Sequence, residues 1–167
     1  MRVLLPKELI DRVQVITPEF MADRGLRGLM LDIDNTLVPH KESGDGKALR
    51  AWLEPLQNAG LQLRLVSNAL PNRIKRFEEL LQVRAVGTGH TAGKPLPAAF
   101  KTAIREMQLE PHEVGMIGDQ IFSDVLGANL VGAYSILVRP LSDNGLPHTK
   151  IARALERIVL RSNGFHW

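Results

Sequence analysis

The sequence predicts an α/β fold in which a mainly parallel sheet is covered by helices on both faces. Two patterns support this prediction. Short apolar runs bounded by glycine or turn residues alternate along the chain with longer segments whose apolar residues recur every three or four positions. Such alternation is typical of βαβ units, whose right-handed crossovers place helices on both sides of a sheet. The length of 167 residues fits one domain over residues 1–167.

The predicted elements follow one another without an interdomain linker. Residues 6–21 have a mixed helical pattern that restarts at Pro18, and the run GLMLDID at 28–34 is too short for a helix and predicts a buried strand. Residues 46–58 carry apolar side chains at spacings of three and four, which predicts an amphipathic helix. The same alternation predicts strands at 61–67, 84–89, 113–119 and 133–138, and helices at 72–82, 97–108, 123–130 and 149–160.

Composition narrows the class of protein and its location. The 21 basic and 18 acidic residues give a net charge of +3, and no run of five or six basic residues stands out, so we expect no nucleic-acid partner. The chain has no cysteine, which excludes disulfides and thiolate metal sites and fits a reducing compartment. No signal-peptide pattern opens the sequence, and no apolar run approaches the ~20 residues of a spanning helix. We therefore expect a cytoplasmic protein.

Polar residues end the predicted strands, and in open parallel sheets ligands bind beyond those ends. Each residue alone has a plain structural explanation: aspartates cap turns, Ser67-Asn68 suits a turn, and a lysine such as Lys94 is most often solvated. Together they form an oxygen-rich cluster whose carboxylates would repel one another unless a cation lay among them, and such a cluster suits Mg²⁺. The set is Asp32, Asp34, Ser67, Asn68, Lys94, Asp119 and Asp124.

The residues around Lys94 do not match either of two nucleotide-binding motifs. The segment GTGHTAGKP around Lys94 has Thr88 where a Walker A loop needs glycine, and Pro95 where it needs Ser or Thr. Gly87, Gly89 and Ala92 have the spacing of a dinucleotide-binding loop, but Pro95 intervenes before any helix could begin. Neither nucleotide-binding loop therefore accounts for Lys94.

The ordered motifs resemble those of the haloacid dehalogenase (HAD) superfamily. The run DIDNTL at 32–37 matches the DxDx[TV] signature, and the three remaining motifs match at Ser67, at Lys94 and at the pair Asp119 and Asp124. The fuller spellings LMLDIDNTLV, VSNA, GKP and IGDQIFSDVLGANLVG resemble the small HAD IIIA phosphatases of the YqeG type, which are similar to phosphatidylglycerophosphate phosphatases of mitochondria and plastids. The resemblance spans roughly residues 3–160. It implies a HAD-like Rossmannoid three-layer sandwich.

The resemblance also implies a role for each motif residue. Asp32 would attack phosphorus and form an aspartyl-phosphate. Asp34 would act as general acid and then as general base, and its backbone carbonyl would bind the metal. The substrate phosphate would be held by Ser67, Asn68 and Lys94, and Mg²⁺ by Asp32, Asp34, Asp119 and Asp124.

The number of residues between the motifs indicates how open the site is. About ten residues separate Thr36 from the helix that begins near Gly46, and residues 68–94 are filled by one helix and one strand. There is no room for a cap domain. We expect an open site that admits a phosphate on a large carrier, such as a lipid headgroup at a membrane surface, a protein or a nucleic-acid end.

The leading hypothesis is a Mg²⁺-dependent phosphomonoester hydrolase, with phosphatidylglycerophosphate as the substrate that the resemblance suggests. Two alternatives stay open. One is a non-catalytic phosphate-binding or regulatory module; the presence of both Asp32 and Asp34 argues against it. The other is a HAD phosphatase or phosphotransferase for a protein, nucleotide or other small phosphorylated substrate.

A lipid substrate would require peripheral contact with a membrane. The predicted helix at 149–160 has an apolar stripe that includes Leu155 and Ile158, with basic residues such as Arg157 around it, as in an interfacial helix. We favour the alternative that this stripe packs on the sheet. The sequence does not predict an oligomeric state.

Overall fold

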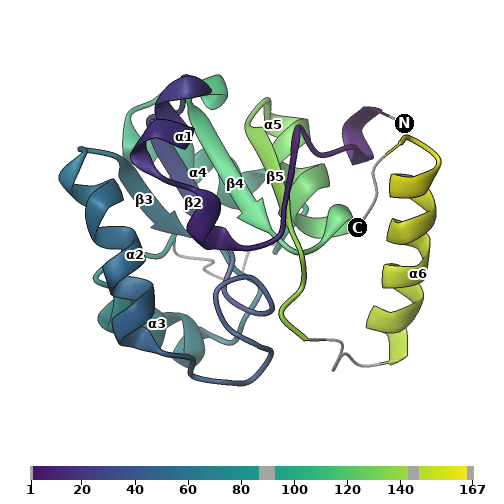
Figure 1. Ribbon diagram of the computed structural model, residues 1–167, viewed down its shortest axis with the longest axis horizontal. Coiled ribbons are helices and arrows are strands. Elements are labelled where there is room, and N and C mark those ends of the chain that lie inside the picture. Colours follow the sequence, from purple (N-terminus) through teal and green to yellow (C-terminus); the bar gives the residue numbers. More distant parts are fainter. Residues whose placement is uncertain (1, 87–92, 143–146, 165–167) are drawn as a thin grey trace.

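The sheet of the computed structural model consists of five parallel strands in the order β1-β5-β4-β2-β3. The structure describes residues 2–86, 93–142 and 147–164 (Figure 1). The strands are β1 (Glu8–Ile10), β2 (Gly28–Leu31), β3 (Gln62–Leu65), β4 (Val114–Gly118) and β5 (Tyr134–Val138). The predicted α/β class with a parallel sheet is confirmed.

Helices cover both faces of this sheet and give three layers (Figure 1). Their bounds are α1 (Pro18–Asp23), α2 (Gly46–Asn58), α3 (Pro71–Leu81), α4 (Pro97–Met107), α5 (Leu126–Val131) and α6 (Pro147–Arg161). The first three pack on one face of the sheet, and α4 and α5 pack on the other. The π-helical segment η4 (Ile121–Val125) joins β4 to α5.

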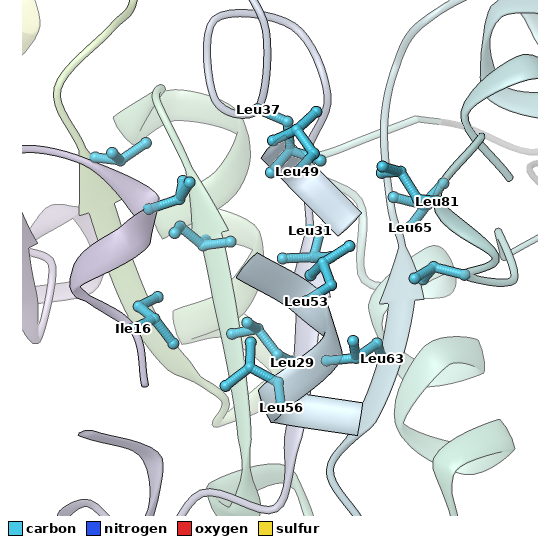
Figure 2. Packing of buried hydrophobic residues seen from close by; sticks show 14 of the residues in the cluster. Ile16, Leu29, Leu31, Leu37, Leu49, Leu53, Leu56, Leu63, Leu65 and Leu81 are labelled. Carbon is cyan, nitrogen blue, oxygen red and sulfur yellow. The ribbon is translucent and has the colours of Figure 1, made fainter. Parts of the chain in front are cut away.

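Successive side chains of a strand point to opposite faces of the sheet, so the core consists of two main clusters, one on each face. In β2, Leu29 and Leu31 face the cluster that includes α2, whereas Met30 lies in the cluster on the opposite face with α4. Figure 2 shows Leu53 and Leu56 of α2 packed against the leucines of β2 and β3. Because each fully buried leucine stabilises the fold by roughly 1.5–3 kcal/mol, this packing fixes α2 and β2 relative to each other.

The predicted helical pattern over residues 6–21 is wrong in part. The segment contains the edge strand β1, a 3₁₀ turn at Val13–Val15 and most of the short helix α1, and a further 3₁₀ turn at Arg2–Leu4 precedes it. Strand β1 pairs with β5 through three residues, with Glu8 opposite Ile136 and Ile10 opposite Val138. A strand of three residues is too short to give a periodic signal in the sequence.

Two further predictions need correction. The predicted strand at 84–89 is reduced, within the described residues, to a single bridge between Ala85 and Leu65, and residues 87–89 lie outside them. The predicted helix at 123–130 begins earlier, as the π-helical segment η4, before α5. The wider turn places Asp124 beneath the end of β4, where its carboxylate accepts a hydrogen bond from the Gln120 N–H over 3.1 Å.

The register of the central strands determines where the motifs meet. Leu31 of β2 lies opposite Leu65 of β3 and Ile117 of β4, so the residues that follow these strands gather at one end of the sheet, here called the carboxyl edge. In the described part of the chain, residues 35–45 and 69–86 contain no further domain above this edge.

Helix α6 lies beside the β5 side of the sheet (Figure 1). Its buried described residues are Glu156 and Leu160, while Leu155 and Ile158 are exposed. The expectation that the whole apolar stripe packs on the sheet is therefore wrong for these two residues. Among the described residues, every helix is too short or too polar to cross a bilayer.

Candidate active site

Three buried aspartates meet at the carboxyl edge of the sheet. Asp32 directly follows β2, Asp119 directly follows β4, and Asp124 comes from η4. One carboxylate oxygen from each lies within 4.8 Å of those from the other two. Backbone pairing sets this geometry, because the Asp32 N–H donates to the Ile117 carbonyl over 3.0 Å and thereby places Asp32 beside the end of β4.

Lys94 lies among these carboxylates. Its Nζ is 2.6 Å from Oδ1 of Asp124 and 2.8 Å from Oδ1 of Asp32, and its side chain is 3% exposed. Burial alone would lower the pKa of Lys94, but the charges of Asp124 and Asp32 outweigh burial and raise it above its usual value. The ammonium therefore carries a fixed positive charge at neutral pH.

One lysine does not neutralise three carboxylates. Burial, together with the nearby charge of Asp32, raises the pKa of Asp124 to about 6 despite the attraction of Lys94. Gly118 allows this crowding, because a Cβ there would collide with the Asp124 carboxylate. Asp32 and Asp124 share the single ammonium of Lys94, and a cation beside them would reduce the repulsion between their carboxylates.

The carboxylates fit a hard divalent cation. Buried carboxylate oxygens at this mutual distance are the donor set that Mg²⁺ prefers. The described residues that could hold it are Asp32, Asp119 and Asp124.

Asn68 fixes the backbone at Lys94. Its Nδ2 donates to the Lys94 carbonyl over 3.0 Å, and its Oδ1 accepts from the Lys94 N–H over 2.8 Å. Gly93 makes room for this amide, because a Cβ at residue 93 would collide with Asn68 Oδ1. The side chain of Asn68 thus positions Lys94, whereas the family resemblance implies phosphate binding for Asn68. Ser67 is buried beside it, and its hydroxyl accepts from the Ala69 N–H over 3.3 Å.

The Asp34 side chain contacts other residues than the three clustered aspartates do. Its Oδ1 accepts hydrogen bonds from Nε and Nη2 of Arg73 over 3.1 and 2.8 Å, and lies 3.5 Å from Nδ1 of His40. The group of acids that could hold a metal, as found in the described residues, does not include Asp34. The structure thus places the two aspartates of the first motif in different surroundings, one in the carboxylate cluster and one on an arginine.

Sequence reasoning missed two contributors to this site. Arg73 lies on α3, and nothing in its spacing from Asp34 indicates that the two meet. Asn35 has a left-handed backbone with φ of 58°, and its Oδ1 accepts from the His40 N–H and from the Ser142 hydroxyl. The run Asp34-Asn35 predicted a turn, but not that Asn35 ties the first motif to the segment after β5.

Comparison with known proteins supports the class that fold and site define. The HAD-hydrolase-like family model matches residues 91–142. The chain is 35% identical over 159 residues to "Probable phosphatase YqeG" of Bacillus subtilis (strain 168), which covers 95% of this chain and 91% of that protein.

Solved structures with the same fold are more distant. A protein from Listeria monocytogenes superposes with a TM-score of 0.53 at 21% identity, covering 82% of this chain and 99% of that one. The cobalt-bound deoxy-D-mannose-octulosonate 8-phosphate phosphatase of Haemophilus influenzae superposes with a TM-score of 0.52 at 13% identity, covering 84% and 91%. At these identities the likeness shows the fold alone.

Fold, site and similarity together define a phosphatase. More specifically, the chain belongs to the haloacid dehalogenase superfamily and, within it, to the phosphatases of the YqeG type.

Proposed function

We propose that this protein is a Mg²⁺-dependent phosphomonoester hydrolase that works through an aspartyl-phosphate on Asp32. The observation that carries the proposal is the buried cluster of Asp32, Asp119 and Asp124 around the ammonium of Lys94. Such a cluster is costly for folding, because Asp32 and Asp124 share one buried lysine and the carboxylate of Asp119 is buried beside them, and clusters of this kind are typical of functional sites.

The reaction divides into two displacements. In the first, a carboxylate oxygen of Asp32 forms a bond to phosphorus, the bond from phosphorus to the ester oxygen breaks, and Asp34 gives its proton to the leaving alcohol. In the second, Asp34 takes a proton from water, whose oxygen attacks the phosphoryl group and releases Asp32 with inorganic phosphate. Each step would need the Asp34 carboxyl group near the ester oxygen of the substrate.

The remaining residues would bind the phosphoryl group and orient it. Lys94 supplies a fixed positive charge, and the Ser67 hydroxyl and the Asn68 backbone N–H would hold phosphoryl oxygens. The metal would be held by Asp32, Asp119, Asp124 and the Asp34 backbone carbonyl, and bound Mg²⁺ would reduce repulsion between Asp32 and the substrate dianion.

For the substrate we propose a phosphate on a large carrier, with phosphatidylglycerophosphate as the first candidate. The described residues leave the carboxyl edge without a cap, so a bulky group can extend out of the site. Exposed Leu155 and Ile158 beside Arg157 and Arg161 on α6 also fit contact with an anionic membrane. We propose that the enzyme works in the cytoplasm, peripherally at a membrane surface.

The test is phosphate release from an aryl phosphate, with Mg²⁺ and with chelator, by the wild type and by Asp32→Asn. We expect activity that the chelator removes and that Asp32→Asn abolishes. Asp23→Asn is the matched control, because Asp23 is exposed at the end of α1, on the opposite side of the fold from the strand ends. Hydrolysis that survives Asp32→Asn would refute the mechanism.

The substrate has a separate test. Phosphatidylglycerophosphate in mixed micelles should be cleaved with a higher kcat/KM than the aryl ester. If only the aryl ester is cleaved, the lipid assignment fails and the enzyme class stands. Added glycerol as a competing acceptor distinguishes transfer from hydrolysis, because a phosphotransferase would release glycerol phosphate in place of part of the inorganic phosphate.

A further inference from the structure

Three exposed leucines lie around the candidate active site. Leu70, Leu96 and Leu141 are 71%, 50% and 45% exposed. Leu70 follows Asn68 by two residues, and Leu96 follows Lys94 by two residues. The Leu141 N–H donates to the Asn35 carbonyl over 3.1 Å, which places Leu141 beside the first motif. We call these three residues the leucine rim.

Two of these leucines occupy positions where a polar residue is expected. Leu70 is the N-cap of α3 and Leu96 the N-cap of α4, and neither side chain accepts a hydrogen bond from the helix. Ser, Thr, Asp and Asn are strongly preferred at N-caps because they satisfy free backbone N–H groups. An exposed leucine at this position neither caps the helix nor packs in the core. Departures from local rules of this kind concentrate at functional sites.

The same edge lacks the acidic residues that usually begin helices. Asp and Glu are favoured in first turns, yet α3, α4 and α6 have none there, and α2 has an acid only at its N-cap, Asp45. Helix α3 instead carries Arg73, Lys75 and Arg76 near its start, and Lys41 is exposed in the loop that Asp34 contacts. The same loop also contains two exposed acidic residues, Glu42 and Asp45.

We propose that the leucine rim is a docking surface for an anionic lipid bilayer, with the leucines entering the interface and the exposed Lys75 and Arg76 of α3 facing lipid headgroups. Apolar side chains beside basic ones, on the face where the site opens, match the two properties of such a surface. A protein partner would explain the leucines, but the exposed basic side chains of Lys75 and Arg76 on α3 and of Lys41 in the loop after β2 favour an anionic lipid surface. The proposal rests on the phosphatase function, because docking would bring a lipid phosphate directly to Asp32.

Vesicle flotation tests the proposal. Full-length protein is mixed with vesicles of phosphatidylcholine containing phosphatidylglycerol, or of phosphatidylcholine alone. We expect the wild type to float with the anionic vesicles only, and the triple variant Leu70→Ser, Leu96→Ser, Leu141→Ser to partition about tenfold less, since each leucine contributes by leaving water. Leu130→Ser is the matched control, because Leu130 is 52% exposed near the end of α5, away from the carboxyl edge.

The outcomes separate docking from catalysis. The triple variant should hydrolyse an aryl phosphate like the wild type, which shows that it folds, and Asp32→Asn should float like the wild type although inactive. The docking proposal is overturned if the wild type does not float, if it binds neutral vesicles equally, or if the triple variant floats undiminished. It is also overturned if Leu155→Ser with Ile158→Ser abolishes flotation while the triple variant retains it, because α6 would then be the docking surface.

Discussion

Arg73 holds the carboxylate of Asp34 through two nitrogen atoms that donate to the same oxygen, Nη2 over 2.8 Å and Nε over 3.1 Å. The same Nη2 donates to the Glu42 carbonyl over 2.8 Å, and the guanidinium lies 5.1 Å from the centre of the Phe77 ring. The arginine is therefore held by α3 and by the loop after β2, and it fixes the direction in which Asp34 points. If Asp34 takes part in the proposed proton transfers, this direction would affect the rate.

Arg73→Met should lower kcat more for substrates whose leaving group must be protonated than for substrates whose leaving group need not be. Without the guanidinium, Asp34 can rotate away from the ester oxygen, and general acid catalysis contributes typically ~10²–10⁴-fold. We expect kcat to fall about tenfold or more for an alkyl phosphate and much less for p-nitrophenyl phosphate, whose leaving group needs little protonation. Arg76→Met, on the exposed face of the same helix, is the control. Equal losses on both substrates would show that Arg73 acts on binding or folding instead.

Gly118→Ala should weaken metal activation. The added Cβ would meet the Asp124 carboxylate, so that side chain would have to move away from Asp32 and Asp119. Displacing groups that orient a metal site typically costs ~10–100-fold in metal affinity. We expect the Mg²⁺ concentration for half-maximal activity to rise about tenfold or more, while KM at saturating Mg²⁺ changes little. An unchanged Mg²⁺ titration would remove Asp124 from the proposed metal site.

Asn68→Ala should lower activity without changing metal affinity. It removes the two hydrogen bonds that hold the backbone at Lys94, each worth about 1 kcal/mol net. A looser lysine would hold the phosphoryl group less well, so we expect kcat/KM to fall on the order of tenfold at saturating Mg²⁺. Asn58→Ala, at the exposed end of α2, is the control. A shift in the Mg²⁺ titration would mean that Asn68 acts on the carboxylate cluster as well.

Sequence predicted the part of this structure that depends on local pattern. The apolar runs around Leu29 and Ile117 identified central strands, and the polar residues after them identified Asp32 and Asp119, because parallel strands end at one edge. Lys94 joins this set because it follows the third predicted strand, although its loop alone resembles any solvated helix start.

Long-range side-chain contacts could not be predicted in this way. The contact between Arg73 and Asp34 spans 39 positions and depends on how α3 is angled over the sheet, which no spacing encodes. Strand β1 was missed because an edge strand of three residues has almost no pattern, and the π-helical turn was missed because it differs from an α-helix by one residue per turn. The turn nevertheless matters, since it carries Asp124 to the cluster.

Asp124→Asn should stabilise the metal-free protein at neutral pH. In the folded chain the pKa of Asp124 is about 6, against an ordinary value of 3.8. Below pH 3.8 the Asp124 carboxyl group is protonated in both the folded and the unfolded chain, so it does not lower the free energy of unfolding. Between pH 3.8 and about 6, Asp124 ionises in the unfolded chain but stays protonated in the folded chain. The free energy of unfolding therefore falls as pH rises through this range, and above about pH 6 it falls no further. Two pKa units correspond to roughly 3 kcal/mol.

Urea unfolding in chelator measures this effect. We expect the midpoint of Asp124→Asn to exceed that of the wild type at pH 7.5 and to equal it near pH 4, with Asp23→Asn unchanged at both. The ion pair with Lys94 does not reverse the sign, because its attraction is already contained in the raised pKa and Lys94 keeps Asp32 as a partner over 2.8 Å. Added Mg²⁺ should stabilise the wild type by about 2.7 kcal/mol at a concentration 100 times its Kd, and the variant by less. A variant less stable than the wild type at pH 7.5 in chelator would show that the ion pair outweighs the burial of the third carboxylate, and the cluster would then be stable without a metal.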